Sequence, residues 1–123
     1  MNYLLVFIGG GLGSICRYGL NEALARYQFT FPWATFIANV LSCIVFGFIA
    51  SLFLKGSIGI PYRIFILTGF CGGFSTFSTF THETFVLLNN QQLALAFANV
   101  ILSLIACLLG LYIGMKIDEL MPD

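Results

Sequence analysis

Long apolar stretches, interrupted by only a few charges, constrain this chain more than any other feature. The stretches from Trp33 to Leu54 and from Leu93 to Met115 carry no charged residue at all. A helix of about 20 apolar residues crosses the hydrocarbon core of a bilayer, which is about 30 Å thick. Only 8% of the residues are charged, against about 25% in average soluble domains. The pattern therefore predicts an all-α integral membrane protein.

Polar links divide the chain into four expected transmembrane helices. The predicted spans cover residues of about 3–24, 33–54, 62–88 and 93–115, within a single membrane domain of residues 1–123. An even number of spans places both termini on the same side of the bilayer. No basic segment precedes the first apolar run, so we expect no cleavable signal peptide.

Composition also excludes several classes of function. The formal net charge is zero, so there is no basic patch for nucleic acid. No Ser/His/Asp set or carboxylate pair shares one depth, which argues against an enzyme. The cysteines match no zinc or thioredoxin spacing, and we expect them to pack as small buried apolar residues. They are Cys16, Cys43, Cys71 and Cys107, one in each predicted helix.

The distribution of Lys and Arg gives only a weak orientation signal. The side of the termini has Lys55, Arg63 and Lys116, and the other side has Arg26 and, if it reaches that far, Arg17. Cations in short loops set the orientation of a membrane protein. Because the bias here is weak, we expect both orientations to coexist. Four helices of this size have too little material to enclose a pore. An oligomer is therefore expected, and an antiparallel dimer is compatible with the weak bias.

Glycines interrupt the third predicted span near its middle. Gly69, Gly72 and Gly73 fall within five residues, and each glycine lowers helix stability by about 1 kcal/mol relative to alanine. We expect the helix to be broken near Gly72-Gly73. A broken backbone in lipid is tolerated where protein or a cavity satisfies it, and its freed carbonyls are cation ligands in discontinuous transporter helices. The alternative is close helix packing through small residues.

Phenylalanines and hydroxyl residues alternate directly after these glycines. Phe77 and Phe80 share a helix face, with Ser78 and Thr79 between them. A phenylalanine ring has a positive edge, and hydroxyls are hydrogen-bond donors. The run is therefore suited to attracting an anion without offering an acidic proton. The alternative for any single phenylalanine is lipid contact or core packing.

Other polar residues lie inside the predicted spans. Asn39 stands two turns into the second helix, and Asn99 and Ser103 form a line on the fourth. Such residues face a pathway or hydrogen-bond between helices. Arg17 and Glu83 are the charges nearest the membrane interior. Arg17 is expected to neutralise an anion, to cap carbonyls or to extend to the interface.

The sequence resembles the CrcB/Fluc family of fluoride channels over essentially its whole length. Gly10-Gly11-x-Gly-x-x-x-Arg17-Tyr18 resembles the opening motif of that family, and Asn39 stands in a string similar to its second-helix motif. The third-helix string running from Gly69 to Phe80 is similar to the family signature and is the most specific match.

The resemblance implies an antiparallel, dual-topology homodimer with two pores, located in the bacterial inner or plasma membrane. It implies passive export of fluoride, which lowers fluoride toxicity. The positions that match the fluoride pathway of the family are Asn39, Phe77, Ser78, Thr79, Phe80 and Ser103. Gly72 and Ser75 match positions whose backbone carbonyls bind a structural Na⁺ at the dimer interface. Arg17 and Glu83 remain candidates for structural or electrostatic roles.

Two competing interpretations come from other classes of protein. A small proton-coupled multidrug exporter is also short and four-helical, but it needs a carboxylate at mid-depth. Here Glu22 and Glu83 lie near helix ends. A non-transporting membrane subunit would not need a polar track in an uncharged helix.

Overall fold

A computed structural model describes residues 1–121, and the regular secondary structure in this range is entirely helical. Its helices are α1 (Asn2–Ala25), α2 (Trp33–Leu54), α3 (Ile60–Arg63), η1 (Ile64–Cys71), α4 (Gly72–Phe74), α5 (Phe77–Asn89) and α6 (Leu93–Leu120). Elements α3 to α5 follow one another as a single span, so four segments are long and apolar enough to cross a membrane. The four-span prediction is confirmed. The expected single domain of residues 1–123 stays a prediction, and its residues 122–123 lie outside the described residues.

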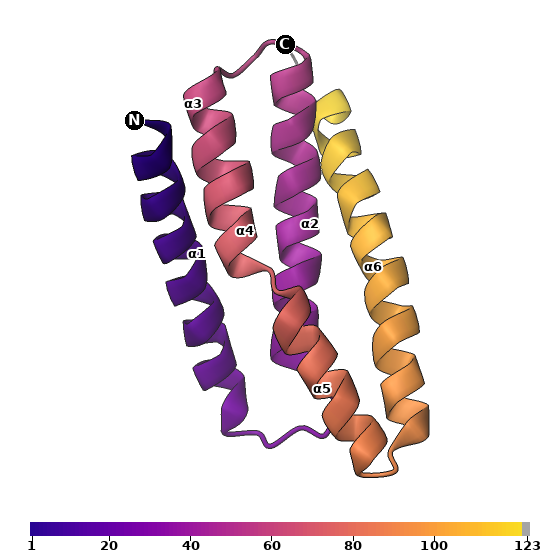
Figure 1. The fold of residues 1–123 in the computed structure, drawn as a ribbon. Coiled ribbons are helices and arrows are strands. Elements are labelled where there is room, and N and C mark those ends of the chain that lie inside the picture. Colours follow the sequence, from indigo (N-terminus) through magenta and orange to yellow (C-terminus); the bar gives the residue numbers. More distant parts are fainter. Residues whose placement is uncertain (122–123) are drawn as a thin grey trace.

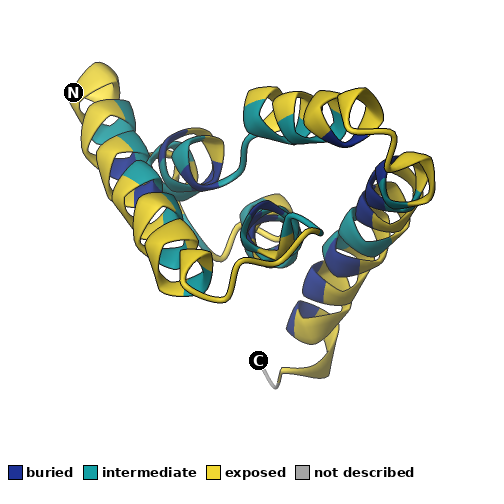
Figure 2. Ribbon diagram, turned by 90° about the horizontal axis from the view of Figure 1, so that it is seen from below, coloured by how far each residue is buried: buried dark blue, intermediate teal, exposed yellow. Residues whose placement is uncertain are grey.

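The four spans lie side by side and alternate in direction, so the start of α1 and the end of α6 lie at the same end of the bundle (Figure 1). Seen from below, α2 lies between α1 on one side and α6 on the other (Figure 2). The buried residues of α6 follow the side that faces α2, and much of its remaining surface is exposed in the single chain. Exposed apolar side chains are what a helix in lipid requires, so this surface fits the membrane environment.

Glycines bring the first half of the third span into direct backbone contact with α1. A Cβ atom on Gly9 would overlap the carbonyl oxygen of Phe65, and one on Gly73 would overlap that of Gly10. Small residues at such contacts allow helices to approach closely in a membrane, where dispersion contacts rather than the hydrophobic effect favour association. The packing interpretation of these glycines therefore holds at Gly73.

Close backbone packing at glycines also joins α2 to α6. A Cβ atom on Gly47 would overlap the carbonyl oxygen of Leu111, and one on Gly114 would overlap that of Ile44. At the end that carries the termini, the buried carboxylate of Asp118 accepts a hydrogen bond of 2.7 Å from Ser51 Oγ. Lys55 Nζ lies 2.9 Å from the same oxygen. These contacts explain why α6 continues to Leu120, beyond the end expected near residue 115.

The third span is broken, as the sequence predicts, but the break falls two residues after the glycines. Gly72 is helical, whereas Ser75 and Thr76 are extended, with ψ angles of 158° and 122°. The segment before the break, η1, is a π-helix, a form that is rare and frequent at functional sites. Thr76 then caps the next helix, because its side chain accepts a hydrogen bond from the backbone of Thr79.

Candidate functional site

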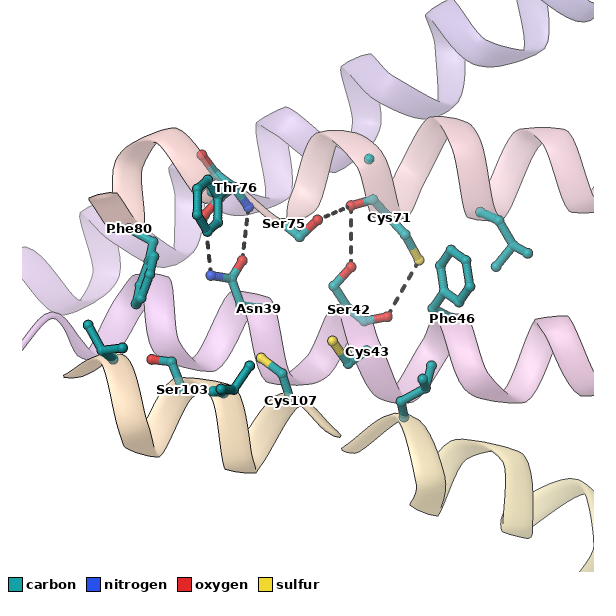
Figure 3. A pocket seen from close by; sticks show the side chains of 16 residues that line it. Asn39, Ser42, Cys43, Phe46, Cys71, Ser75, Thr76, Phe80, Ser103 and Cys107 are labelled. Atoms are coloured by element: carbon teal, nitrogen blue, oxygen red, sulfur yellow. Dashed lines mark hydrogen bonds between the residues drawn. The ribbon is translucent and has the colours of Figure 1, made fainter. Parts of the chain in front are cut away.

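A cavity of about 660 Å³ opens beside the break. Its walls come from α2, from the third span on both sides of the break, and from α6 (Figure 3). The residues along it that the resemblance connects with fluoride or Na⁺ are Asn39, Gly72, Ser75, Phe77, Phe80 and Ser103. Among the described residues, those lining this cavity include no charged side chain. Any ion in it would therefore meet dipoles and ring edges rather than a formal charge.

Asn39 holds the broken backbone in place. Its Oδ1 accepts a hydrogen bond of 2.9 Å from the backbone N–H of Thr76, and its Nδ2 donates one of 3.3 Å to the carbonyl of Thr76 (Figure 3). The amide thus satisfies two backbone groups that the break leaves without helical partners. Because an amide nitrogen carries two donor hydrogens, one N–H of Asn39 remains for another acceptor in the cavity.

Hydroxyl groups satisfy a second carbonyl just before the break. The Cys71 carbonyl accepts hydrogen bonds of 3.2 Å from Ser42 Oγ and 2.7 Å from Ser75 Oγ (Figure 3). The backbone N–H of Ser75 also donates to it, at 3.0 Å. Ser42 is buried and reaches across from α2. One side chain from α2 and one from the break itself therefore stabilise the end of the interrupted helix.

The carbonyls of Gly72 and Ser75 lose their usual helical partners. In a continuous α-helix, each carbonyl accepts from the N–H four residues later. The N–H of Thr76 donates instead to Asn39, and the N–H of Thr79 donates to the hydroxyl of Thr76. The break therefore releases the two carbonyl oxygens that the resemblance connects with Na⁺.

The two candidate phenylalanines lie together at the start of α5. The ring centroids of Phe77 and Phe80 are 5.7 Å apart, and their planes are tilted by 40°. Phe77 is 79% exposed in the single chain, although both rings line the cavity. Ser78 and Thr79 lie outside the cavity lining, and both hydroxyls contact the hydroxyl of Thr76, at 3.3 and 3.2 Å.

Ser103 belongs to a chain of hydrogen bonds that connects α6 with α5. Its Oγ donates to Oδ1 of Asn99 at 3.2 Å, and Nδ2 of Asn99 donates to Thr84 Oγ1 at 2.9 Å. The hydroxyl of Thr84 donates in turn to the carbonyl of Phe80 at 2.8 Å. Asn99 is only 1% exposed, so this residue is an interhelical link.

The two candidate charges lie outside the cavity. Arg17 Nε donates a hydrogen bond of 3.0 Å to the carbonyl of Gly73, so Arg17 caps a carbonyl near the break, one of the three roles expected for it. Glu83 borders a second, smaller cavity of about 140 Å³ near the loop between α1 and α2. Its buried Oε1 accepts no hydrogen bond from the described residues.

Sequence reasoning gave no site role to three residues that organise the break. Ser42 and Thr76 bond directly at the interruption, and Thr84 connects Asn99 to α5. One local signal was present, because Thr76 precedes an amphipathic segment and threonine is a preferred N-cap residue. That signal places a helix start at Phe77 and hence the break at Thr76. The contacts made by Ser42 and Thr84 depend on how the helices pack.

These features define a multi-pass helical membrane protein with an interrupted third span beside a neutral cavity. Residues 4–115 match the model of a protein family described as "CrcB-like protein, Camphor Resistance (CrcB)". The chain belongs to this family.

Curated relatives match nearly the whole chain. The chain is 42% identical over 119 residues to "Fluoride-specific ion channel FluC 2" of Nitrobacter hamburgensis, covering 95% of this chain and 96% of the relative. It is 43% identical over 111 residues to "Fluoride-specific ion channel FluC" of Pyrococcus horikoshii, with 89% of each chain covered. It is 37% identical over 119 residues to the protein of that name from Bacteroides fragilis, with 90% of this chain and 94% of the relative covered.

Proposed function

We propose that this protein is a fluoride-selective channel that lets F⁻ leave the cell passively across the cytoplasmic membrane. The uncharged cavity beside the break carries the proposal, since its wall combines an amide, hydroxyls and phenylalanine rings. The names of the curated relatives support the same function. They give no support to the multidrug exporter, and a channel of this kind is a transporter rather than an enzyme.

The chemistry of the wall fits a small, strongly hydrated anion. Fluoride must exchange part of its water shell for donors along the pore. The candidate donors and positive edges in the wall belong to Asn39, Phe77, Phe80 and Ser103. The other two candidates, Ser78 and Thr79, lie outside the lining but contact the hydroxyl of Thr76, which is part of it. Asn39 has an N–H beyond the one that bonds Thr76, and hydroxyl hydrogens rotate to suit a new acceptor.

The absence of a charged residue in the described cavity wall favours conduction over tight binding. An ion must bind well enough to enter and weakly enough to leave. A lysine or arginine at low dielectric would hold an anion strongly, because Coulomb energies grow as the dielectric constant falls. Neutral dipoles lower the cost of dehydration and still release the ion.

A second copy of the chain in antiparallel orientation completes the pathway in this proposal. The cavity of a single chain is open, and Phe77 at its edge is largely exposed. A copy packed against this face would cover that ring and enclose the polar wall. The few cations at either end of the spans are consistent with a chain that inserts in both orientations.

We assign the carbonyls of Gly72 and Ser75 to a structural Na⁺ at the dimer interface. Both oxygens lack their helical partners, and unwound backbone carbonyls coordinate Na⁺ in transporters. The cation would stabilise the broken helix and tie it to assembly. Dimer content measured in sodium-free medium should fall relative to medium with Na⁺, and an equal dimer content in the two media would contradict the assignment.

Reconstitution into liposomes tests the channel directly. Vesicles loaded with KF, and supplied with a K⁺ ionophore to balance charge, should show rapid passive F⁻ efflux by the fluoride electrode. Matched vesicles loaded with KCl should retain Cl⁻. A folded dimer that releases no F⁻ would favour a non-transporting subunit. Cation uptake driven by a proton gradient would instead favour the exporter.

Isoleucine substitutions test the two rings. Phe77→Ile and Phe80→Ile remove the aromatic edge and keep apolar volume, so each should slow F⁻ efflux roughly tenfold or more, which corresponds to about 1.4 kcal/mol of added barrier. Phe85→Ile is the matched control, because Phe85 lies on the same helix, is 60% exposed and does not line the cavity. Wild-type efflux from both ring variants would remove these side chains from the pathway.

A further inference from the structure

Two cysteines from different helices meet in the cavity wall. Cys43 lies on α2 and Cys107 on α6, and both are half-buried and line the cavity. Figure 3 shows both side chains in the space between the two helices. The pair is therefore a bidentate set of sulfur donors, which neither the family match nor the proposed pathway uses.

The backbone contact of α2 with α6 holds the two thiols together. Around Cys43, the carbonyls of Val40 and Ile44 lie against Gly110 and Gly114 of α6. A Cβ atom on Gly110 would stand 3.2 Å from the carbonyl oxygen of Val40. Cys107 stands one turn before Gly110 on the same helix. Because glycines on both helices fix the distance between the backbones here, Cys43 and Cys107 are held on facing helices in the wall of one cavity.

The other two cysteines are placed differently. Cys71 is buried, and its Sγ lies 3.7 Å from the carbonyl of Ser42, to which it donates. Cys16 is exposed on α1 and does not line the cavity. Neither residue therefore has the half-buried, paired arrangement of Cys43 and Cys107.

We propose that Cys43 and Cys107 form a binding site for a soft metal cation that takes two ligands, with Hg²⁺ as the representative ion. Thiolates select soft metals. Within residues 1–121, no group of three or more His, Cys, Asp or Glu side chains is placed to hold a metal. Structural Zn²⁺ sites use four protein ligands, so a pair of thiols suits an ion that binds two sulfur atoms in a line.

Charge balance favours the same ion at this depth. Each thiol loses its proton to water as its sulfur bonds the metal, so Hg²⁺ and two thiols give a neutral bis-thiolate and two protons. A neutral product avoids leaving a net charge in a medium of low dielectric constant, where an uncompensated charge is costly. The metal would connect α2 to α6 across the cavity wall.

Protection from alkylation tests the site, and it requires no transport measurement. The protein is purified in detergent with Cys16 and Cys71 replaced by alanine, incubated with one equivalent of HgCl₂, and then treated with N-ethylmaleimide. Mass spectrometry should show that one metal ion protects both remaining thiols. In the Cys43→Ala or Cys107→Ala variant of this background, the remaining thiol should lose the metal to a modest excess of a small monothiol, whereas the intact pair should retain it.

Controls distinguish paired ligands from independent thiols. Zn²⁺ at the same concentration should leave both thiols open to alkylation, because the pair lacks the further ligands that zinc takes. A variant that keeps Cys16 and Cys71 but lacks Cys43 and Cys107 should lose all of its bound Hg²⁺ to the monothiol. The proposal is overturned if one equivalent of Hg²⁺ protects a single thiol, or if either single-cysteine variant retains the metal as well as the pair does. Serine variants repeat the test if an alanine variant is lost during purification.

Discussion

The two halves of the third span differ in how they are held, although they follow each other in one apolar stretch. Before the break, η1 and α4 contact α1 so closely that a Cβ atom on Gly73 would overlap a backbone oxygen. After the break, α5 diverges from α1 and runs toward α6 (Figure 1). There the chain carries hydroxyls and exposes Phe77. The first half is fixed by backbone packing, and the second presents side chains to the cavity.

This division explains why a broken helix is stable inside a membrane. The freed backbone groups have specific partners. Asn39 hydrogen-bonds both the N–H and the carbonyl of Thr76, and Arg17 donates to the carbonyl of Gly73. Hydrogen-bond partners supplied by protein allow irregular backbone at membrane depth. The packed half thus provides a rigid base from which α5 starts in a new direction.

The largest expected effect is on the packed half, in the variant Gly73→Ala. The added Cβ would overlap the carbonyl oxygen of Gly10, and its next nearest atoms, 3.0 and 3.1 Å away, also belong to the backbone of Gly10. Forcing two helices apart costs about 1–3 kcal/mol or more. We expect loss of folded protein, measured as the free energy of unfolding in mixed micelles and as the yield of folded protein.

Gly72→Ala is the matched control for this variant. No atom lies within 4 Å of a Cβ built on Gly72, and alanine favours a helix over glycine by about 1 kcal/mol. Gly72→Ala should therefore fold at least as well as the wild type and keep its backbone carbonyl. Equal stability of the two alanine variants would show that close packing does not distinguish these neighbouring glycines.

The next largest effect is expected at the junction of the two halves, in the variant Asn39→Ala. This change removes the partners of the N–H and the carbonyl of Thr76. Both bonds are part-buried, so the loss should be about the net worth of two hydrogen bonds, roughly 1 kcal/mol each. We expect a lower free energy of unfolding and a loss of fluoride efflux. Thermal unfolding in detergent and the fluoride electrode measure the two effects.

Ser42→Ala is the control for Asn39→Ala, since it removes one bond to a carbonyl that keeps other donors. The Cys71 carbonyl still accepts from the side chain and the backbone of Ser75. The loss should be at most about 1 kcal/mol, the net worth of a typical hydrogen bond. If Ser42→Ala reduces stability and efflux as much as Asn39→Ala does, the amide of Asn39 is not the main hydrogen-bond partner that supports the break.

Much of the fold is predictable from the sequence, because hydropathy and helix length respond to the bilayer alone. The second span begins at Trp33 and ends at Leu54, as the uncharged stretch predicts. The end of α6 is different. Charged residues after Met115 indicate an end at the membrane surface, yet Asp118 turns inward to Ser51 and Lys55. That contact depends on the position of α2, which periodicity within one helix does not encode.

The candidate site is likewise predictable from the sequence only in part. Residue type and spacing select Asn39, Phe77, Phe80 and Ser103, and all four line one cavity. The position of the break is harder to predict from the sequence. A glycine indicates backbone freedom, but Gly73 instead allows close contact with α1. The interruption moves to Thr76, where the partner is an amide from another helix. Local preference therefore predicts that a break occurs, and tertiary contacts decide where.

The smallest effect on stability, and the sharpest separation of packing from conduction, is expected on α6 at Ser103. Its hydroxyl donates to Asn99, which keeps its bond to Thr84 when Ser103 is replaced by alanine. This bond lies within α6, and the net contribution of a typical intramolecular hydrogen bond is at most about 1 kcal/mol. Ser103→Ala should therefore change the free energy of unfolding little while slowing fluoride efflux, since Ser103 lines the cavity.

Thr84→Val should show the opposite pattern. It deprives the buried amide of Asn99 of its acceptor, which costs about 1–3 kcal/mol, but Thr84 does not line the cavity. Efflux per folded chain should then remain near that of the wild type. Two variants that change stability and efflux in the same proportion would place Ser103 in the interhelical network alone. Divergent effects would separate the conducting face of the cavity wall from the bonds that support it.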